Sequence, residues 1–249
     1  MKIISVVPSL TELLFDLGLD AHIIGVTRFC IHPAEKTRKV TKVGGTKSLK
    51  IDRIIDLKPD LIIANKEENA QADIEELQKH CNVWVTDIFT LSDALDMVSE
   101  LGIKTHTTDQ AQALITQIKA EFKKLSAQVT PSQKKVAYLI WDEPIMLAGR
   151  NTFIHHMIEE LGWTNMIKEP DSRYPMMESK QLKELQPDYI LLSSEPYPFK
   201  EKHLPKFKSE FPNSKIILVD GEMFSWYGSR MKLAPSYFID LLTEASSVS

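Results

Sequence analysis

The segment LKPDLIIA at residues 57–64 returns as LQPDYILL at residues 185–192, with every residue numbered 128 higher. In each copy, the proline disfavours a helical conformation of the residue before it, so a helix should end there. The aspartate then opens an apolar run typical of a buried strand. Residues 85–87 and 218–220 form a second, weaker match in the same order. The repeat predicts two similar α/β lobes.

Short strand-like runs alternate with helical patterns along most of the chain, which is typical of parallel α/β proteins. The strands are predicted at residues 3–7, 22–26, 61–64, 83–86, 136–141, 189–192 and 215–219. Helices are predicted at residues 91–101, 152–161 and 234–245, and a first one from Ser9 to Gly18. For that first helix, Ser9 and Glu12 have the spacing of a capping box, with Ser9 as the N-cap.

A longer helix is predicted at residues 107–126, a stretch without Gly or Pro. Its apolar residues recur at helical spacing, at Ala111, Leu114, Ile115, Ile118, Phe122 and Leu125. About 20 residues at 1.5 Å each give roughly 30 Å of helix, enough to cross a small domain. We therefore expect an N-terminal lobe at residues 1–104, a bridging helix at 105–129 and a C-terminal lobe at 130–249.

Composition excludes several classes of protein. The 249 residues are 43% hydrophobic and carry a net charge of −4, which argues against disorder and against general attraction to nucleic acid. Two cysteines exclude a disulfide-built scaffold, and a single Cys30–Cys81 bridge stays open. No apolar run approaches the roughly 20 residues of a membrane span. The start lacks the apolar stretch of a secretory signal, so the sequence as written predicts a cytoplasmic protein.

Ligands of parallel α/β sheets bind outside the carboxyl ends of the strands, and in two lobes those ends can face a common cleft. The loops that follow the predicted strands are rich in aromatic residues, arginine and proline. The candidate ligand-binding residues in these loops are Pro8, Ser9, Arg28, Phe29, Cys30, His32, Gly45, Thr46, Asn65, Trp141, Arg150, Arg173, Tyr174, Tyr197, Phe199, Phe224, Trp226, Tyr227 and Arg230.

Two interpretations are open for most of these residues. The aromatic side chains stack on a large flat ligand, or they pack their own loops onto the lobes. The arginines grip carboxylates or phosphates, or they form surface ion pairs.

Metal and catalytic chemistry have little support. Cys30 and His32 are good ligand types, but two ligands do not close a zinc site, so the pair is at most a source of axial ligands to a chelated metal. Gly44–Lys47 lacks the spacing of a P-loop, and no motif places a histidine beside Ser193. We expect no catalytic residues and no intrinsic cofactor.

The repeat also pairs Glu67 with Glu195, each just past the end of a predicted strand. Such a pair is suited to docking on a two-fold partner, although surface acids without a role fit the pattern equally well. Glu68 and Glu201 are nearby substitutes if the register shifts.

Several motifs resemble those of the class III periplasmic binding proteins, the helical-backbone metal receptors. They are VVPSLTELLFDLG at 6–18, IIGVT at 23–27, VGG at 43–45, LKPDLIIA at 57–64, GRNTFIHHMIEELGWTNM at 149–166 and VDGEMFSWYGSR at 219–230. The resemblance implies two Rossmann-like lobes joined by one long helix. It also implies a metal chelate held between the lobes for an ABC importer, export from the cytoplasm, and docking of Glu67 and Glu195 on permease arginines.

The first two motifs are most similar to the cobalamin-binding branch. Asn65 stands where that branch has tryptophan, and residues 29–33 replace an aromatic and acidic loop. The implied ligand is therefore a corrinoid such as cobalamin, a ferric siderophore or haem. The alternative is a cytoplasmic ligand-binding or sensor protein that has this fold and serves no importer.

Overall fold

The computed structural model describes residues 1–168 and 172–246, which form two compact units. Unit 1 contains Met1–Ile88, Ser92–Ile118 and Tyr227–Lys232, and unit 2 contains the other described residues. The chain therefore enters unit 1 a last time near its C-terminal end, through Tyr227–Lys232.

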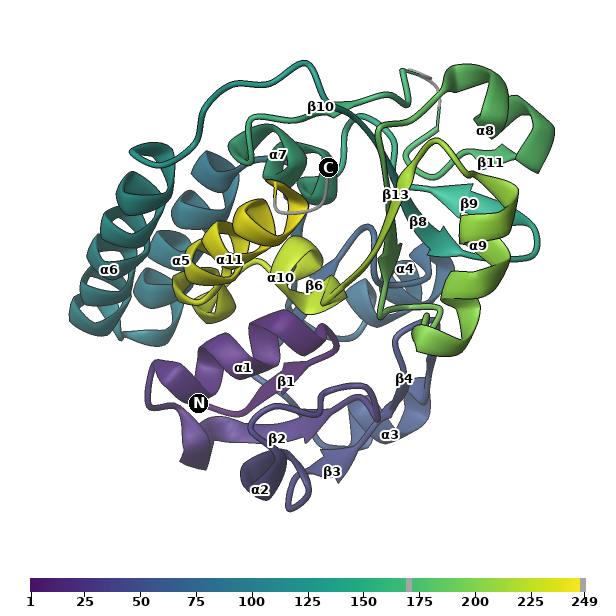
Figure 1. Ribbon diagram of the computed structural model, residues 1–249. Helices are drawn as coiled ribbons and strands as arrows, with labels where there is room; N and C mark the ends of the chain where they lie inside the picture. Colours follow the sequence, from purple (N-terminus) through teal and green to yellow (C-terminus); the bar gives the residue numbers. More distant parts are fainter. Residues whose placement is uncertain (169–171, 247–249) are drawn as a thin grey trace. The chain divides into compact units, whose positions relative to one another are not determined.

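Unit 1 is built on a parallel five-stranded sheet in the order β3-β2-β1-β6-β7 (Figure 1). Its strands are β1 (Ile3–Ser5), β2 (Ile23–Val26), β3 (Thr41–Lys42), β6 (Leu61–Asn65) and β7 (Val83–Thr86), with a hairpin of β4 (Gly44–Gly45) and β5 (Ser48–Leu49). Its helices are α1 (Pro8–Asp16), α2 (Ala34–Thr37), α3 (Ile51–Asp56), α4 (Gln71–Gln78) and most of α5 (Leu91–Thr105). Ile4 and Ile62 of the sheet pack with Ile54 and Leu77 of the helices in a fully buried core.

The first helix begins differently from the prediction. Pro8 is its first residue and Val7 is the N-cap, with no side-chain hydrogen bond at the cap, so the predicted capping box of Ser9 and Glu12 is wrong. Proline suits this position because its fixed φ is helical and its missing N–H would have no partner. The helix ends as predicted before Gly18, which has a φ of +80°.

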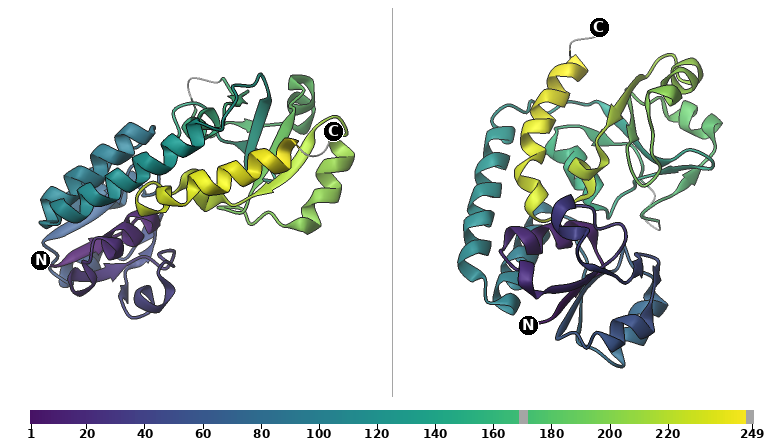
Figure 2. Two further views of the ribbon diagram at one scale, coloured as in Figure 1. Left: turned by 60° about the vertical axis from the view of Figure 1, so that its left-hand side comes forward. Right: turned by 90° about the horizontal axis from the view of Figure 1, so that it is seen from below.

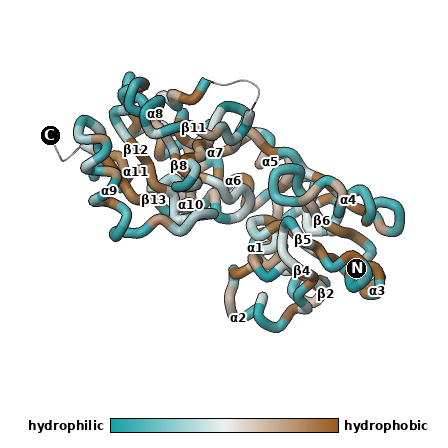
Figure 3. The backbone as a smooth tube through the Cα atoms, turned by 90° about the vertical axis from the view of Figure 1, so that its right-hand side faces the viewer, coloured by the Kyte–Doolittle hydropathy of each residue, from teal (hydrophilic) through white to brown (hydrophobic). Residues whose placement is uncertain are grey.

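Unit 2 has a mixed six-stranded sheet in which β11-β9-β8-β12-β13 follow in order and β10 pairs with β8. Its strands are β8 (Lys135–Trp141), β9 (Ile145–Leu147), β10 (Thr164–Asn165), β11 (Met176–Met177), β12 (Tyr189–Ser193) and β13 (Lys215–Val219). Its helices are α7 (Phe153–Glu160), α8 (Ser179–Leu185), α9 (Leu204–Glu210), α10 (Gly221–Ser225) and α11 (Ala234–Ser246). Figure 3 shows hydrophobic residues along β8 and β12, where Leu139, Ile190 and Leu192 are fully buried.

The two repeat copies occupy the same place in their sheets. LKPDLIIA contains β6, which lies between β1 and β7, and LQPDYILL contains β12, which lies between β8 and β13. All four of these neighbour pairs are parallel. The prediction of two similar α/β lobes is therefore confirmed by the strand order.

The predicted long helix is α6 (Thr108–Ser126), whose 19 residues span about 28 Å. Its predicted apolar stripe is buried, and the helix passes from unit 1 into unit 2 after Ile118. In unit 1, α5 and α6 lie side by side (Figure 2), and a Cβ on Gly102 would come within 2.5 Å of the Ala111 Cβ. No helix within the described residues combines the length and apolar composition that crossing a bilayer demands.

Candidate functional site

In unit 1, the loop after β2 presents an exposed aromatic ring. Phe29 is 47% exposed, and the guanidinium carbon of Arg28 lies 4.9 Å from the centre of its ring. A Cβ on Gly45 would lie 3.2 Å from the same ring, so the glycine hairpin lets Phe29 lie close against it. An exposed ring with a cation beside it can stack on a flat, anionic ligand.

In unit 2, Trp141 ends β8 and is 41% exposed. Its ring meets Tyr197 edge-on with centroids 5.4 Å apart, and Tyr197 lies 4.7 Å from buried Phe199. Lys206 binds both Asp142 (2.8 Å) and Glu143 (3.0 Å), and so restrains the turn that follows Trp141. Trp141 is thus a partly exposed aromatic ring at a strand end, with the Tyr197 ring packed against it.

The other predicted ligand-binding residues divide by exposure. Arg150 is exposed, and partial exposure is found for Pro8, His32, Thr46, Arg173, Tyr174, Tyr197 and Arg230. Those buried in the structure are Ser9, Cys30, Gly45, Asn65, Phe199, Phe224, Trp226 and Tyr227.

Phe224 illustrates the packing interpretation. Its ring is fully buried between Tyr138 (5.0 Å) and Phe238 (4.8 Å), so it is a core residue of unit 2 rather than a stacking platform. Two arginines are also engaged within their own units. Arg173 lies over the Phe89 ring at 4.5 Å, and Arg230 forms an ion pair with Glu12.

Cys30 is buried among hydroxyl groups of unit 1. Its Sγ lies 3.1 Å from Thr11 Oγ1 and 3.2 Å from Thr27 Oγ1, and burial raises the pKa of the thiol. Cys30 and Cys81 are both free thiols. Across residues 1–168 and 172–246, no three His, Cys, Asp or Glu side chains gather closely enough to hold a metal ion. The axial-ligand role of Cys30 and His32 stays a prediction.

Asn65 was predicted to contact ligand, and the structure gives it a different set of partners. Its buried side-chain oxygen accepts the N–H of Glu67 (2.8 Å) and of Glu68 (3.2 Å), while its amide nitrogen donates to Thr86. These bonds fix the turn that follows β6. Asn at a strand end is a sequence signal for such a turn, because its side chain can bond the backbone two residues further on.

Ser193 lies 128 residues after Asn65, at the equivalent position of the repeat, and it organises the turn that follows β12 in unit 2. Its hydroxyl accepts a bond from Tyr138 (3.0 Å), donates to the carbonyl of Glu195 (2.6 Å) and lies 3.4 Å from the Glu195 nitrogen. Thus the two glutamates of the repeat each sit on a turn organised by the last residue of their strand. Both glutamates are partly exposed.

Comparison with known proteins identifies the class. A family profile described as "Periplasmic binding protein" matches residues 3–214. The chain therefore belongs to the periplasmic binding protein family. Its two α/β units and α6 have the architecture of the class III members.

Three relatives are distant in sequence but cover nearly the whole chain. The vitamin B12-binding protein of Pectobacterium carotovorum is 24% identical, over 98% of this chain and 89% of the relative. The crystal structure of the periplasmic vitamin B12-binding protein of Vibrio cholerae has a TM-score of 0.85 at 19% identity, covering 99% and 98% of the two chains. The periplasmic heme-binding protein of Roseiflexus sp. RS-1 has a TM-score of 0.83 at 20% identity, covering 98% of each.

Proposed function

We propose that this protein is the solute-binding component of an ABC-type importer and that it binds a metal chelate: a corrinoid, haem or a ferric siderophore. One observation carries the proposal. Each unit presents an exposed aromatic ring at or just past the carboxyl end of a strand, Phe29 after β2 and Trp141 at the end of β8. The placement of the ligand between the lobes stays a prediction of the sequence.

The chemistry of these ligands suits the surfaces. Corrin and porphyrin rings are broad and apolar on their faces and carry polar or anionic groups at their edges. Phe29 and Trp141 would stack on the faces, and Arg28 and Arg150 would bind the edge groups. Relatives that bind vitamin B12 and heme support this ligand class. The proposed activity is binding without catalysis.

Ligand binding is tested by titrating the purified protein with cyanocobalamin, haemin and a ferric siderophore, followed by tryptophan quenching and calorimetry. We expect saturable one-to-one binding of one of the three. Failure of all three to bind would overturn the ligand assignment.

We further propose that Glu67 and Glu195 dock on cationic side chains of the permease. Their equivalent positions in the repeat and the matching turns of Asn65 and Ser193 support this role. Replacing both glutamates with lysine should abolish stimulation of the permease ATPase in nanodiscs while leaving ligand affinity unchanged. Glu184→Lys, on the exposed surface of α8, is the matched control. Full stimulation by the double variant would remove the docking role.

A further inference from the structure

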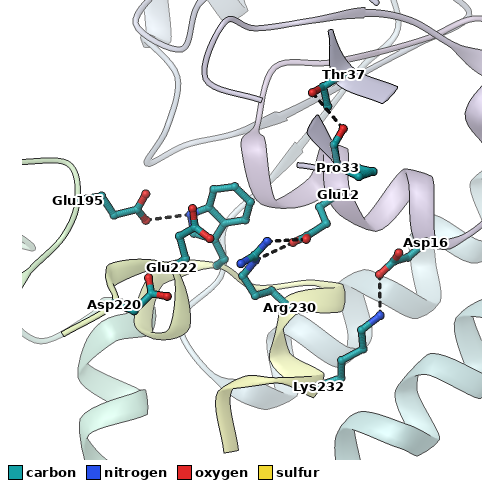
Figure 4. A network of polar contacts seen from close by, with 10 residues as sticks. Glu12, Asp16, Pro33, Thr37, Glu195, Asp220, Glu222, Arg230 and Lys232 are labelled. Atoms are coloured by element: carbon teal, nitrogen blue, oxygen red, sulfur yellow. Dashed lines mark hydrogen bonds and ion pairs between the residues drawn. The ribbon is translucent and has the colours of Figure 1, made fainter. Parts of the chain in front are cut away.

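The Glu195 carboxylate is held by two side-chain donors in unit 2. Its Oε1 accepts a hydrogen bond from Ser225 Oγ (2.7 Å) and another from Trp226 Nε1 (2.8 Å). Figure 4 shows the dashed contact between Glu195 and the indole ring. Ser225 is the last residue of α10 and Trp226 is its C-cap, so both donors are placed by one short helix.

The stem of Glu195 is restrained as well. A Cβ on Gly221 would lie 2.6 Å from Glu195 Cγ and 2.5 Å from Ser193 Oγ, so only glycine lets the start of α10 approach the glutamate this closely. Ser193 fixes the backbone of the same residue through its bond to the Glu195 carbonyl. The backbone, the stem and the carboxylate of Glu195 are thus each held by a different neighbour.

The nature of the donors matters for what the carboxylate can do. An indole N–H can only donate, so in this hydrogen bond Trp226 is the donor and the Glu195 carboxylate is the acceptor. The indole group carries no charge. The serine hydroxyl is also neutral. Because both donors are neutral, neither of these two hydrogen bonds cancels the charge of a carboxylate, as a bond from lysine or arginine would.

Holding a glutamate before binding reduces the entropy lost on association, because the side chain has less rotamer freedom left to lose. We propose that Trp226 is a positioning residue for Glu195: together with Ser225, it orients the carboxylate for docking on a cationic surface of the permease. This inference rests on the docking role proposed for Glu195. A purely structural alternative is that the same bonds only fasten α10 to the turn after β12.

Trp226→Phe separates the positioning role from the purely structural role, because phenylalanine keeps an aromatic ring and removes the N–H donor. We expect the concentration of binding protein that half-saturates permease ATPase stimulation to rise about 3- to 10-fold, with the maximal rate unchanged. Ser225→Ala removes the other donor with little change in volume and should act in the same direction. Trp163→Phe, at a buried tryptophan of the same unit that packs on Tyr189, is the matched control and should leave docking unchanged.

A spectroscopic readout checks the bond itself. The chain has four tryptophans, so ¹⁵N-indole labelling gives four N–H signals, and Trp226→Phe assigns one of them. Glu195→Gln should shift that signal and leave the other three in place. An unmoved Trp226 signal would show that the bond is absent in solution and would overturn the inference.

The docking results distinguish the inference from the function on which it rests. If Glu195→Lys impairs docking and neither Trp226→Phe nor Ser225→Ala does, positioning is overturned and the docking role stands. If Glu195→Lys leaves docking intact, the docking role fails and positioning fails with it. If Trp226→Phe strongly lowers the melting temperature, its docking result no longer reports on positioning, and the Ser225→Ala result then tests positioning by itself.

Discussion

The guanidinium of Arg230 and the carboxylate of Glu12 form a two-pronged ion pair within unit 1, although they are 218 positions apart in the chain. Arg230 Nη2 lies 2.6 Å from one carboxylate oxygen and Nε 2.9 Å from the other, and the side chains are only 11% and 16% exposed. Lys232 forms a second pair with Asp16 at 2.9 Å. Both pairs, visible in Figure 4, attach the Tyr227–Lys232 segment to α1.

Removing Arg230 should therefore destabilise the protein. Arg230→Gln leaves the Glu12 carboxylate in a largely buried place without its bidentate partner, and we expect a loss of about 2–4 kcal/mol in the free energy of unfolding. Lys232→Gln breaks the more exposed pair and should cost less than about 1 kcal/mol. Urea unfolding of both variants measures the difference. Equal losses would mean that the Arg230 pair contributes no more than a surface pair.

The two cysteines should react very differently. Burial raises the pKa of both thiols, but the Cys30 thiol is buried, whereas Cys81 is partly exposed and therefore within reach of reagents in solution. Thiolate is the reactive form, so Ellman's reagent should modify Cys81 slowly in the native protein and Cys30 only after unfolding. Cys81→Ser should abolish the native-state reaction, and Cys30→Ser should leave it. Fast labelling of Cys30 would contradict the buried placement of this thiol.

Contact between α5 and α6 depends on Gly102. Alanine there would bring two Cβ atoms to 2.5 Å, and the helices must separate to relieve the clash. We expect Gly102→Ala to lower the free energy of unfolding by about 1–3 kcal/mol, despite the better helix propensity of alanine. Ile103→Ala, at a neighbouring side chain that is 63% exposed, is the control and should change stability by about 0.5 kcal/mol or less. A stabilising Gly102→Ala would show that α5 and α6 pack less closely than described.

His155 should make stability sensitive to acid. Burial lowers its pKa, Arg150 and His156 lower it further, and Glu159 opposes them. The unfolded chain therefore takes up a proton at a higher pH than the folded protein does, so stability falls as pH drops below the ordinary histidine pKa of about 6.5. His155→Gln should flatten the stability profile between about pH 7 and 5. Thermal melts of the wild-type protein and of His155→Gln between about pH 7 and 5 measure this effect. An unchanged profile for His155→Gln would mean that a group other than His155 causes the acid sensitivity.

Some features were predictable because the signal is local or periodic. The repeat located β6 and β12 and paired Glu67 with Glu195, since a proline, an aspartate and an apolar run recur together. The apolar stripe of α6 follows from helical periodicity alone.

Other features depend on partners far away in the chain. Glu12 has the spacing of a capping residue, but its partner is Arg230. Asn65 stands at a strand end, where ligand contacts are common, yet its amide serves the backbone of its own turn. The bond from Trp226 to Glu195 joins the C-cap of α10 to the turn after β12, 31 positions away in the chain. No local pattern reports such contacts.

The central claim is that exposed aromatic rings at strand ends bind a metal chelate. It is tested most directly by calorimetric titration of the wild-type protein, Phe29→Ala, Trp141→Ala and the control Ile103→Ala with cyanocobalamin, haemin and a ferric siderophore. We expect one of the three to bind saturably, with an affinity that falls about 10-fold in each aromatic variant and is unchanged in the control. Saturable binding that neither aromatic variant weakens, or no binding of any of the three chelates, would contradict it.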